Sequence, residues 1–259
     1  MKKSWKKKAI SIAMLLLIIC VLSGMCYIKD YYHSENIEQQ YVQMEGTVKI
    51  EEIDVGLFLD GMGNRDALIF YPGAKVEYKS YIPLFYHLAD QGMDVFLLHM
   101  PCNFAFLGKN KADDIINAYE YENWYIGGHS LGGAMAASYA ADHLDILRGV
   151  VLMSAYPTDS LKEEEFSVLS IYGSEDKVLN MEKVKEGREY MPSDYTEICI
   201  DGGNHAQFGN YGIQGGDGKA LIPAEEQQEL QISVDLHADS VCNCMPISER
   251  SAQHSALTA

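Results

Sequence analysis

The stretch NWYIGGHSLGGAMAASYAAD, residues 123–142, places Ser130 between two pairs of glycines. The apolar run at its start predicts a strand, and the alanine-rich run after Ser130 predicts a helix. A glycine inside a regular element costs about 0.5–1 kcal/mol relative to alanine. Four glycines around one serine therefore indicate a tight turn between the strand and the helix.

Gly128-His129-Ser130-Leu131-Gly132 fits the pattern G-x-S-x-G between a strand and a helix, which is typical of a nucleophile elbow. Such a turn exposes the serine oxygen at the carboxyl end of a sheet, and its small residues let strand and helix approach. Ser130 is therefore the candidate nucleophile. The alternative is a glycine-rich turn that carries an ordinary serine.

The rest of the chain predicts an α/β fold. Two strands that could pair as a hairpin come first, and strands and helices alternate from residue 67 onward, which favours a mostly parallel sheet of about eight strands with helices on both faces. Only nine residues, 157–165, join two of the later strands, so we expect no large lid there. The expected strands are 47–54, 55–61, 67–71, 93–101, 123–128, 148–156, 166–173 and 196–203, and the expected helices are 81–92, 111–120, 130–142, 181–191 and 223–241.

A serine nucleophile needs a base and an acid, which follow it in the order serine, acid, histidine. Of the eight histidines, His205 is the one on a loop after a late strand, in DGGNHAQFG. Asp176, in YGSEDKV, follows the preceding strand and is the favoured acid. Asp159, after the strand before that, is the alternative. The acid would hold the imidazole in the right tautomer without taking its proton.

Two backbone N–H groups should form an oxyanion hole. One belongs to the residue after the nucleophile, Leu131. The other should lie in the loop YPGAKV after the strand 67–71, where Ala74 is our choice.

Four stretches make the sequence similar to the α/β-hydrolases, and in particular to a bacterial lidless subgroup related to the dienelactone hydrolases. The resemblance covers about residues 47–242 and implies an α/β-hydrolase fold with Ser130, Asp176 and His205 in the roles given above. Dienelactone hydrolases have cysteine where this chain has Ser130, and many relatives have His-Gly where it has Pro72-Gly73. The stretches are YPGAKVEYKSYIPL, GGHSLGGAMAASYAA, LSIYGSEDKV and GGNHAQFGNYG.

The N-terminus is organised like a membrane anchor. Residues 1–8 form a basic tail, and 9–28 are an uncharged apolar run that would span about 30 Å as a helix. Lysines ahead of the run favour a cytoplasmic N-terminus and a single-pass anchor in the cell membrane, with the rest extracytoplasmic. A cleaved signal peptide, which would release a secreted protein, is the alternative. The predicted spacer is 29–45, the hydrolase domain 46–242 and the C-terminal tail 243–259.

Charge and cysteine content exclude some other classes of function. The 259 residues carry a formal net charge of −17, and all 37 acidic residues lie beyond the basic tail, so we expect no binding to nucleic acid or to anionic membrane. The six cysteines do not form a disulfide framework in a chain of this length. Cys242 and Cys244 are weak evidence for a metal, and we expect no metal or organic cofactor.

The sequence thus predicts a serine hydrolase of the carboxylesterase type that cleaves small-molecule carboxylic esters through an acyl-enzyme. An acyltransferase using the same acyl-enzyme and a non-catalytic binding protein on this fold are the alternatives. The sequence does not indicate the acyl group, the alcohol or the oligomeric state.

Overall fold

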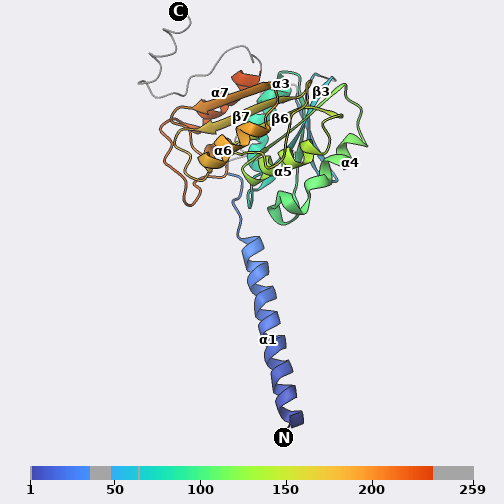
Figure 1. Ribbon diagram of the computed structural model, residues 1–259, viewed down its shortest axis with the longest axis vertical. Helices are drawn as coiled ribbons and strands as arrows, with labels where there is room; N and C mark the ends of the chain where they lie inside the picture. Colours follow the sequence, from blue (N-terminus) through green and yellow to red (C-terminus); the bar gives the residue numbers. More distant parts are fainter. Residues whose placement is uncertain (1, 36–47, 64, 236–259) are drawn as a thin grey trace, which may run out of the picture.

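The computed structural model describes residues 2–35, 48–63 and 65–235. Parts of the expected spacer and of the last helix, together with the whole C-terminal tail, lie outside these ranges. The described chain folds into an eight-stranded sheet with helices packed on both faces, and a long N-terminal helix projects from it (Figure 1).

The sheet has the order β1-β2-β4-β3-β5-β6-β7-β8. As expected, β1 and β2 form an antiparallel hairpin, β2 pairs antiparallel with β4, and the remaining pairs are parallel. The predicted mostly parallel sheet is therefore confirmed. The strands are β1 Lys49–Ile53, β2 Gly56–Asp60, β3 Asp66–Tyr71, β4 Asp94–Leu98, β5 Asn123–His129, β6 Leu147–Met153, β7 Ser167–Gly173 and β8 Asp194–Ile200.

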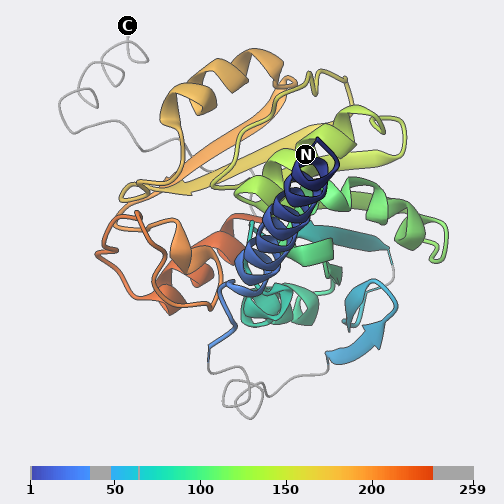
Figure 2. The same cartoon turned by 90° about the horizontal axis from the view of Figure 1, so that it is seen from below.

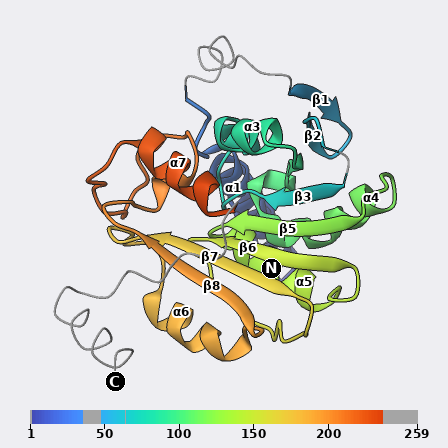
Figure 3. The ribbon, with the colours of Figure 1, turned by 90° about the horizontal axis from the view of Figure 1, so that it is seen from above.

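Strand β3 shows why the central strands have continuous apolar runs. Ile69 and Tyr71 point into the core on one face of the sheet, whereas Leu68 and Phe70 point into the core on the other. Because both faces are covered, the strand shows no polar alternation. Figure 3 shows α3 and α7 over one face and α5 and α6 over the other. The helices are α1 Lys2–Lys29, α3 Ile82–Asp90, α4 Ala112–Ile116, α5 Leu131–Ala141, α6 Met181–Gly187 and α7 Ala224–Asp235.

Several expected boundaries were wrong. The expected helix 111–120 is only the five residues of α4. Ahead of it lie three short 3₁₀ turns, Pro101–Asn103, Ala105–Leu107 and Lys109–Lys111, where we expected only the end of a strand at residue 101 and the start of a helix at residue 111. Strand β6 ends at Met153 because Ser154 has a φ of 46°, which no strand accommodates.

Helix α1 stands apart from the core. Its segment Ile10–Lys29 is long and apolar enough to cross a membrane, and none of that segment is buried within the protein. The exposed side chains distinguish α1 from a core helix.

Candidate active site

Ser130 lies in a strained turn at the end of β5. Its φ of 55° and ψ of −124° fall outside the regions that non-glycine residues prefer, which costs about 1–3 kcal/mol. A Cβ on Gly128 would come within 2.5 Å of the Gly132 carbonyl carbon, and a Cβ on Gly132 would come within 2.2 Å of the Tyr71 backbone carbonyl oxygen. Both positions therefore require glycine, because a side chain would separate α5 from β5 and from the loop after β3.

Asp176 and His205 form a buried pair. The Nδ1 atom of His205 lies 2.8 Å from Oδ2 of Asp176, and the two residues are 1% and 7% exposed. The other carboxylate oxygen accepts the N–H groups of Val178 and Leu179, both at 2.8 Å. The carboxylate is therefore held in one orientation by three hydrogen bonds.

Charge favours an ionised Asp176. Burial raises the pKa of this carboxyl. The hydrogen bond and charge of His205 and the N–H of Leu179 lower the pKa by more than burial raises it, so the pKa lies below its ordinary value. Nε2 of His205 is buried and makes no hydrogen bond to any part of the chain that the structure describes. The imidazole thus has one nitrogen bonded to a carboxylate, whereas the other has no hydrogen-bond partner among the described residues. The alternative acid, Asp159, is exposed and bonds to Thr158.

The loop after β3 lies against the start of α5. Gly73 donates its N–H to Tyr81 Oη at 3.1 Å, and Lys75 donates its N–H to the Asn103 carbonyl at 2.8 Å. Ala74, the expected oxyanion donor, lies between these two anchored amides. Leu131, the other expected donor, is the first residue of α5, where helical N–H groups have no partner within the helix.

The sequence did not single out His129 as a residue of the site. Its ring is fully buried, with its centroid 4.5 Å from that of His205, and its Nδ1 lies 2.8 Å from Tyr81 Oη. Tyr81 also accepts the Gly73 N–H. His129 therefore connects the loop after β8 that carries His205, here called the histidine loop, with the loop that carries Ala74. The signal available in the sequence was a polar residue at the last position of a buried strand.

Helix α7 holds the histidine loop in place. The Gln227 side chain accepts the Asn204 N–H at 3.0 Å and donates to the Asn204 carbonyl at 2.9 Å. Asp217 accepts the Ala206 N–H at 2.8 Å. The residues on either side of His205 are thus both fixed through their backbone.

The aromatic residues at or after the ends of β3, β4 and β8 differ in exposure. Tyr71, Phe208 and Tyr211 are buried in the core. Phe106, in contrast, is 54% exposed on the second 3₁₀ turn, next to Phe104.

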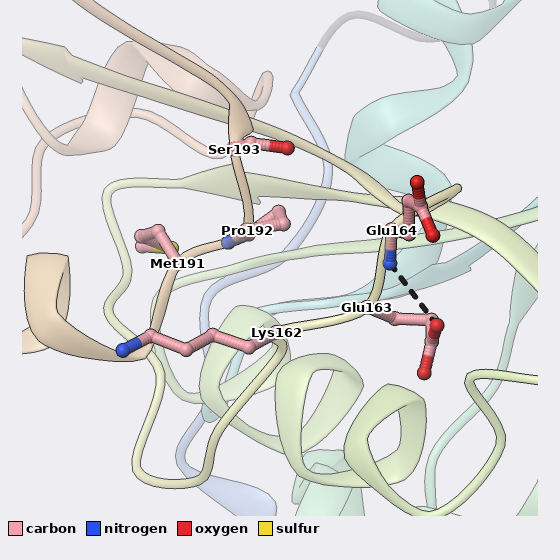
Figure 4. A pocket seen from close by; sticks show the side chains of 6 residues that line it. All are labelled: Lys162, Glu163, Glu164, Met191, Pro192 and Ser193. Atoms are coloured by element: carbon pink, nitrogen blue, oxygen red, sulfur yellow. Dashed lines mark hydrogen bonds between the residues drawn. The ribbon is translucent and has the colours of Figure 1, made fainter.

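Two surface hollows are lined by residues outside the candidate site. One, of about 560 Å³, is lined by residues just before β7 and β8 at the amino edge of the parallel sheet, and it includes Lys162 and Met191 (Figure 4). The other, of about 720 Å³, lies between the β1–β2 turn and the end of α4. Neither is lined by Ser130, Asp176 or His205. Within the described ranges, no three His, Cys, Asp or Glu side chains gather as metal ligands would, and Cys242 and Cys244 lie outside those ranges.

The serine turn and the Asp176–His205 pair together are typical of one class of protein. A glycine-flanked serine on a strand–helix turn precedes a buried Asp–His pair at the ends of later parallel strands, as in α/β-hydrolases. The sequence model of the Alpha/beta hydrolase family matches residues 67–229, more than half of the chain. The protein belongs to this family, and the predicted superfamily and fold are confirmed.

Solved structures show the same fold at low sequence identity. A predicted CIB-like hydrolase from Thermoplasma acidophilum has a TM-score of 0.56 at 16% identity, covering 75% of this chain and 99% of its own. Est1E from Butyrivibrio proteoclasticus has a TM-score of 0.52 at 14% identity, covering 74% and 98%. A membrane phospholipase A described as a bacterial virulence factor has a TM-score of 0.54 at 12% identity, covering 88% and 99%. A search of curated proteins gave no match.

Proposed function

We propose that this hydrolase cleaves carboxylic esters through an acyl-enzyme, with Ser130 as nucleophile, His205 as base and Asp176 as the acid that orients it. The observation that carries the proposal is the buried His205–Asp176 hydrogen bond of 2.8 Å, which uses Nδ1 and leaves Nε2 without a hydrogen-bond partner in the described part of the chain. The ring centroids of His205 and His129 are 4.5 Å apart, and His129 directly precedes Ser130, which supports a position of His205 near the serine turn.

In this mechanism Ser130 Oγ attacks the ester carbonyl carbon while His205 Nε2 takes its proton. The tetrahedral oxyanion accepts hydrogen bonds from the N–H groups of Leu131 and Ala74, each of which contributes about 3 kcal/mol. The acyl–oxygen bond then breaks, and His205 protonates the leaving alcohol. A water molecule, deprotonated by His205, releases the acid and regenerates Ser130.

A fluorophosphonate probe and a panel of chromogenic esters of increasing acyl length test the proposal. We expect the wild type to be labelled and active, and Ser130→Ala to be unlabelled, with its turnover lowered at least about a thousandfold. Asp176→Asn should lose about four orders of magnitude, because it leaves His205 in the wrong tautomer. Asp159→Asn, the matched control, should retain wild-type turnover.

Equal labelling of the wild type and Ser130→Ala would rule out Ser130 as the nucleophile. An unlabelled, inactive wild type would favour the non-catalytic binding protein. Dominant acyl transfer to an added alcohol, rather than release of the acid, would identify an acyltransferase.

We also propose that α1 is an uncleaved single-pass anchor, with its lysine-rich start in the cytoplasm and the hydrolase domain outside. The exposed apolar length of Ile10–Lys29 supports this proposal. Protease added to intact cells should digest the domain. Full protection would contradict the orientation, and a mature chain that lacks residues 1–24 would favour the secreted alternative.

A further inference from the structure

The end of α1 is joined directly to the loop that carries the candidate oxyanion donor. Tyr32 donates its N–H to the Lys75 carbonyl at 2.7 Å, and Glu77 donates its N–H to the Tyr32 carbonyl at 2.9 Å. Tyr32 and Val76 thereby form a parallel β-bridge. The Lys75 ammonium lies 4.3 Å from the centre of the Tyr27 ring, on the last turns of α1.

These contacts limit how far the candidate site can be from the apolar part of α1. Only residues 29–31 separate Ile28, the last apolar residue of the helix, from Tyr32. An extended chain spans at most about 3.6 Å per residue, so Tyr32 lies within about 15 Å of Ile28. If Ile10–Lys29 is in a bilayer, the loop 72–77 therefore lies close to the bilayer surface.

The short 3₁₀ turns at 101–107 extend the apolar surface of α1 onto the domain. The Tyr27 and Phe104 rings stack with their centroids 6.3 Å apart, and Phe106 lies 5.4 Å from Phe104. Phe106 and Leu107 are 54% and 53% exposed. Figures 1 and 2 show this segment, just before α4, on the side of the domain from which α1 projects.

This apolar segment is also bonded to the candidate site. The Asn103 carbonyl accepts the Lys75 N–H at 2.8 Å, so the turns at 101–107 and the loop 72–77 form one connected unit. The unit includes both the exposed Phe106 and Leu107 and the amide of Ala74. An apolar surface next to a membrane helix is suited to insertion among lipids.

We propose that Phe106 and Leu107 insert into the bilayer that holds α1, and that the site takes its ester from a membrane lipid. This substrate class rests on the ester hydrolysis proposed above. In a lipid ester the carbonyl lies at the boundary between headgroups and acyl chains, which is the depth that Phe106 and Leu107 would reach. Hydrolysis breaks the acyl–oxygen bond and leaves a free fatty acid and the alcohol part of the lipid. The contact is apolar, so it does not need anionic lipid.

The test uses the full chain in phosphatidylcholine vesicles that contain a fluorogenic ester lipid, with a soluble short-chain ester assayed in parallel. We expect Phe106→Asp/Leu107→Asp to lower the ratio of the vesicle rate to the soluble rate at least tenfold. The matched control is Met62→Asp/Ile146→Asp, which changes two exposed apolar residues in the segments that lead into the amino ends of β3 and β6. This control should leave the ratio unchanged.

A ratio that is the same in both double variants, or a wild type that cleaves only the soluble ester, would overturn the lipid substrate. A wild type that cleaves neither ester would refute the proposed function, and the lipid substrate with it.

Membrane contact has a readout that does not depend on catalysis. In vesicles with bromine on the acyl chains, the added fluorescence of Phe106→Trp should be quenched, and that of Met62→Trp should not. Equal quenching of the two variants, or none in either, would overturn the insertion of Phe106.

Discussion

At the scale of single residues, the candidate site is built from residues with an unusual backbone conformation or an unusual protonation state. Ser130 has a positive φ, and Asp176 is a buried carboxylate whose pKa lies below its ordinary value. His129 is buried beside His205, and burial together with that neighbour holds the pKa of His129 well below its ordinary value. A neutral His129 can keep its hydrogen bond to Tyr81 without placing a second positive charge next to the proposed base.

The state of His129 predicts a pH dependence of stability. Below about pH 6.5 the unfolded chain protonates this histidine while the folded chain does not, so the free energy of unfolding falls as the pH drops. The effect is at most about 1.4 kcal/mol per pH unit. In urea unfolding between pH 7 and pH 5, His129→Gln should show a shallower decline than the wild type. His87→Gln, at an exposed helix position, should keep the wild-type slope, and identical slopes for all three proteins would contradict a neutral His129.

At the scale of elements, the last helix supports the site from outside it. Gln227 of α7 is fully buried and pairs with both backbone groups of Asn204, next to His205. The long expected helix 223–241 gave no sign of this role, because Gln227 gains its partner only when α7 packs beside the loop after β8. At α4 the local pattern misled in the other direction. The apolar spacing predicted a helix over 111–120, but only five of those residues are α-helical.

Replacing Gln227 by leucine should loosen the histidine loop. The buried N–H and carbonyl of Asn204 would lose their partners, at about 1–3 kcal/mol for each unpaired group. We expect a lower midpoint of thermal unfolding and a lower kcat on a soluble ester. Glu226→Leu changes an exposed position of the same helix and should affect neither. A Gln227→Leu enzyme with an unchanged melting temperature and unchanged turnover would show that Gln227 is not needed to position the loop that carries His205.

At the scale of the whole molecule, the N-terminal helix and the hydrolase domain are connected parts. Residues 30–35 continue from α1 along the candidate site, where Glu35 donates its N–H to the Asn210 carbonyl at 2.8 Å and Tyr32 packs on Tyr211. The structure thus ties α1 to two of the site's loops.

Removing residues 2–28 should separate anchoring from catalysis. The full chain should stay in membranes washed with alkaline carbonate, because about 20 apolar residues span the hydrocarbon. The shortened chain should be soluble and should still cleave a short-chain ester, since it keeps Tyr32 and its bonds to the loop 72–77. Carbonate extraction of the full chain would argue against an integral anchor.

Local patterns in the sequence were enough to predict the succession of strands and helices along the chain, the mostly parallel sheet and the turn at Ser130. These features depend on local periodicity and on glycines, which are visible within a few residues. Asp176 and His205 could be proposed from their positions after strands, because parallel strands bring their carboxyl ends to one edge. Which distant groups meet at that edge depends on how the elements pack in the tertiary structure. The pairing of His129 with Tyr81, the hold of Gln227 on Asn204 and the contact of Tyr32 with Lys75 join residues 23 to 48 positions apart, and no local pattern encodes such contacts, because packing of whole elements creates them.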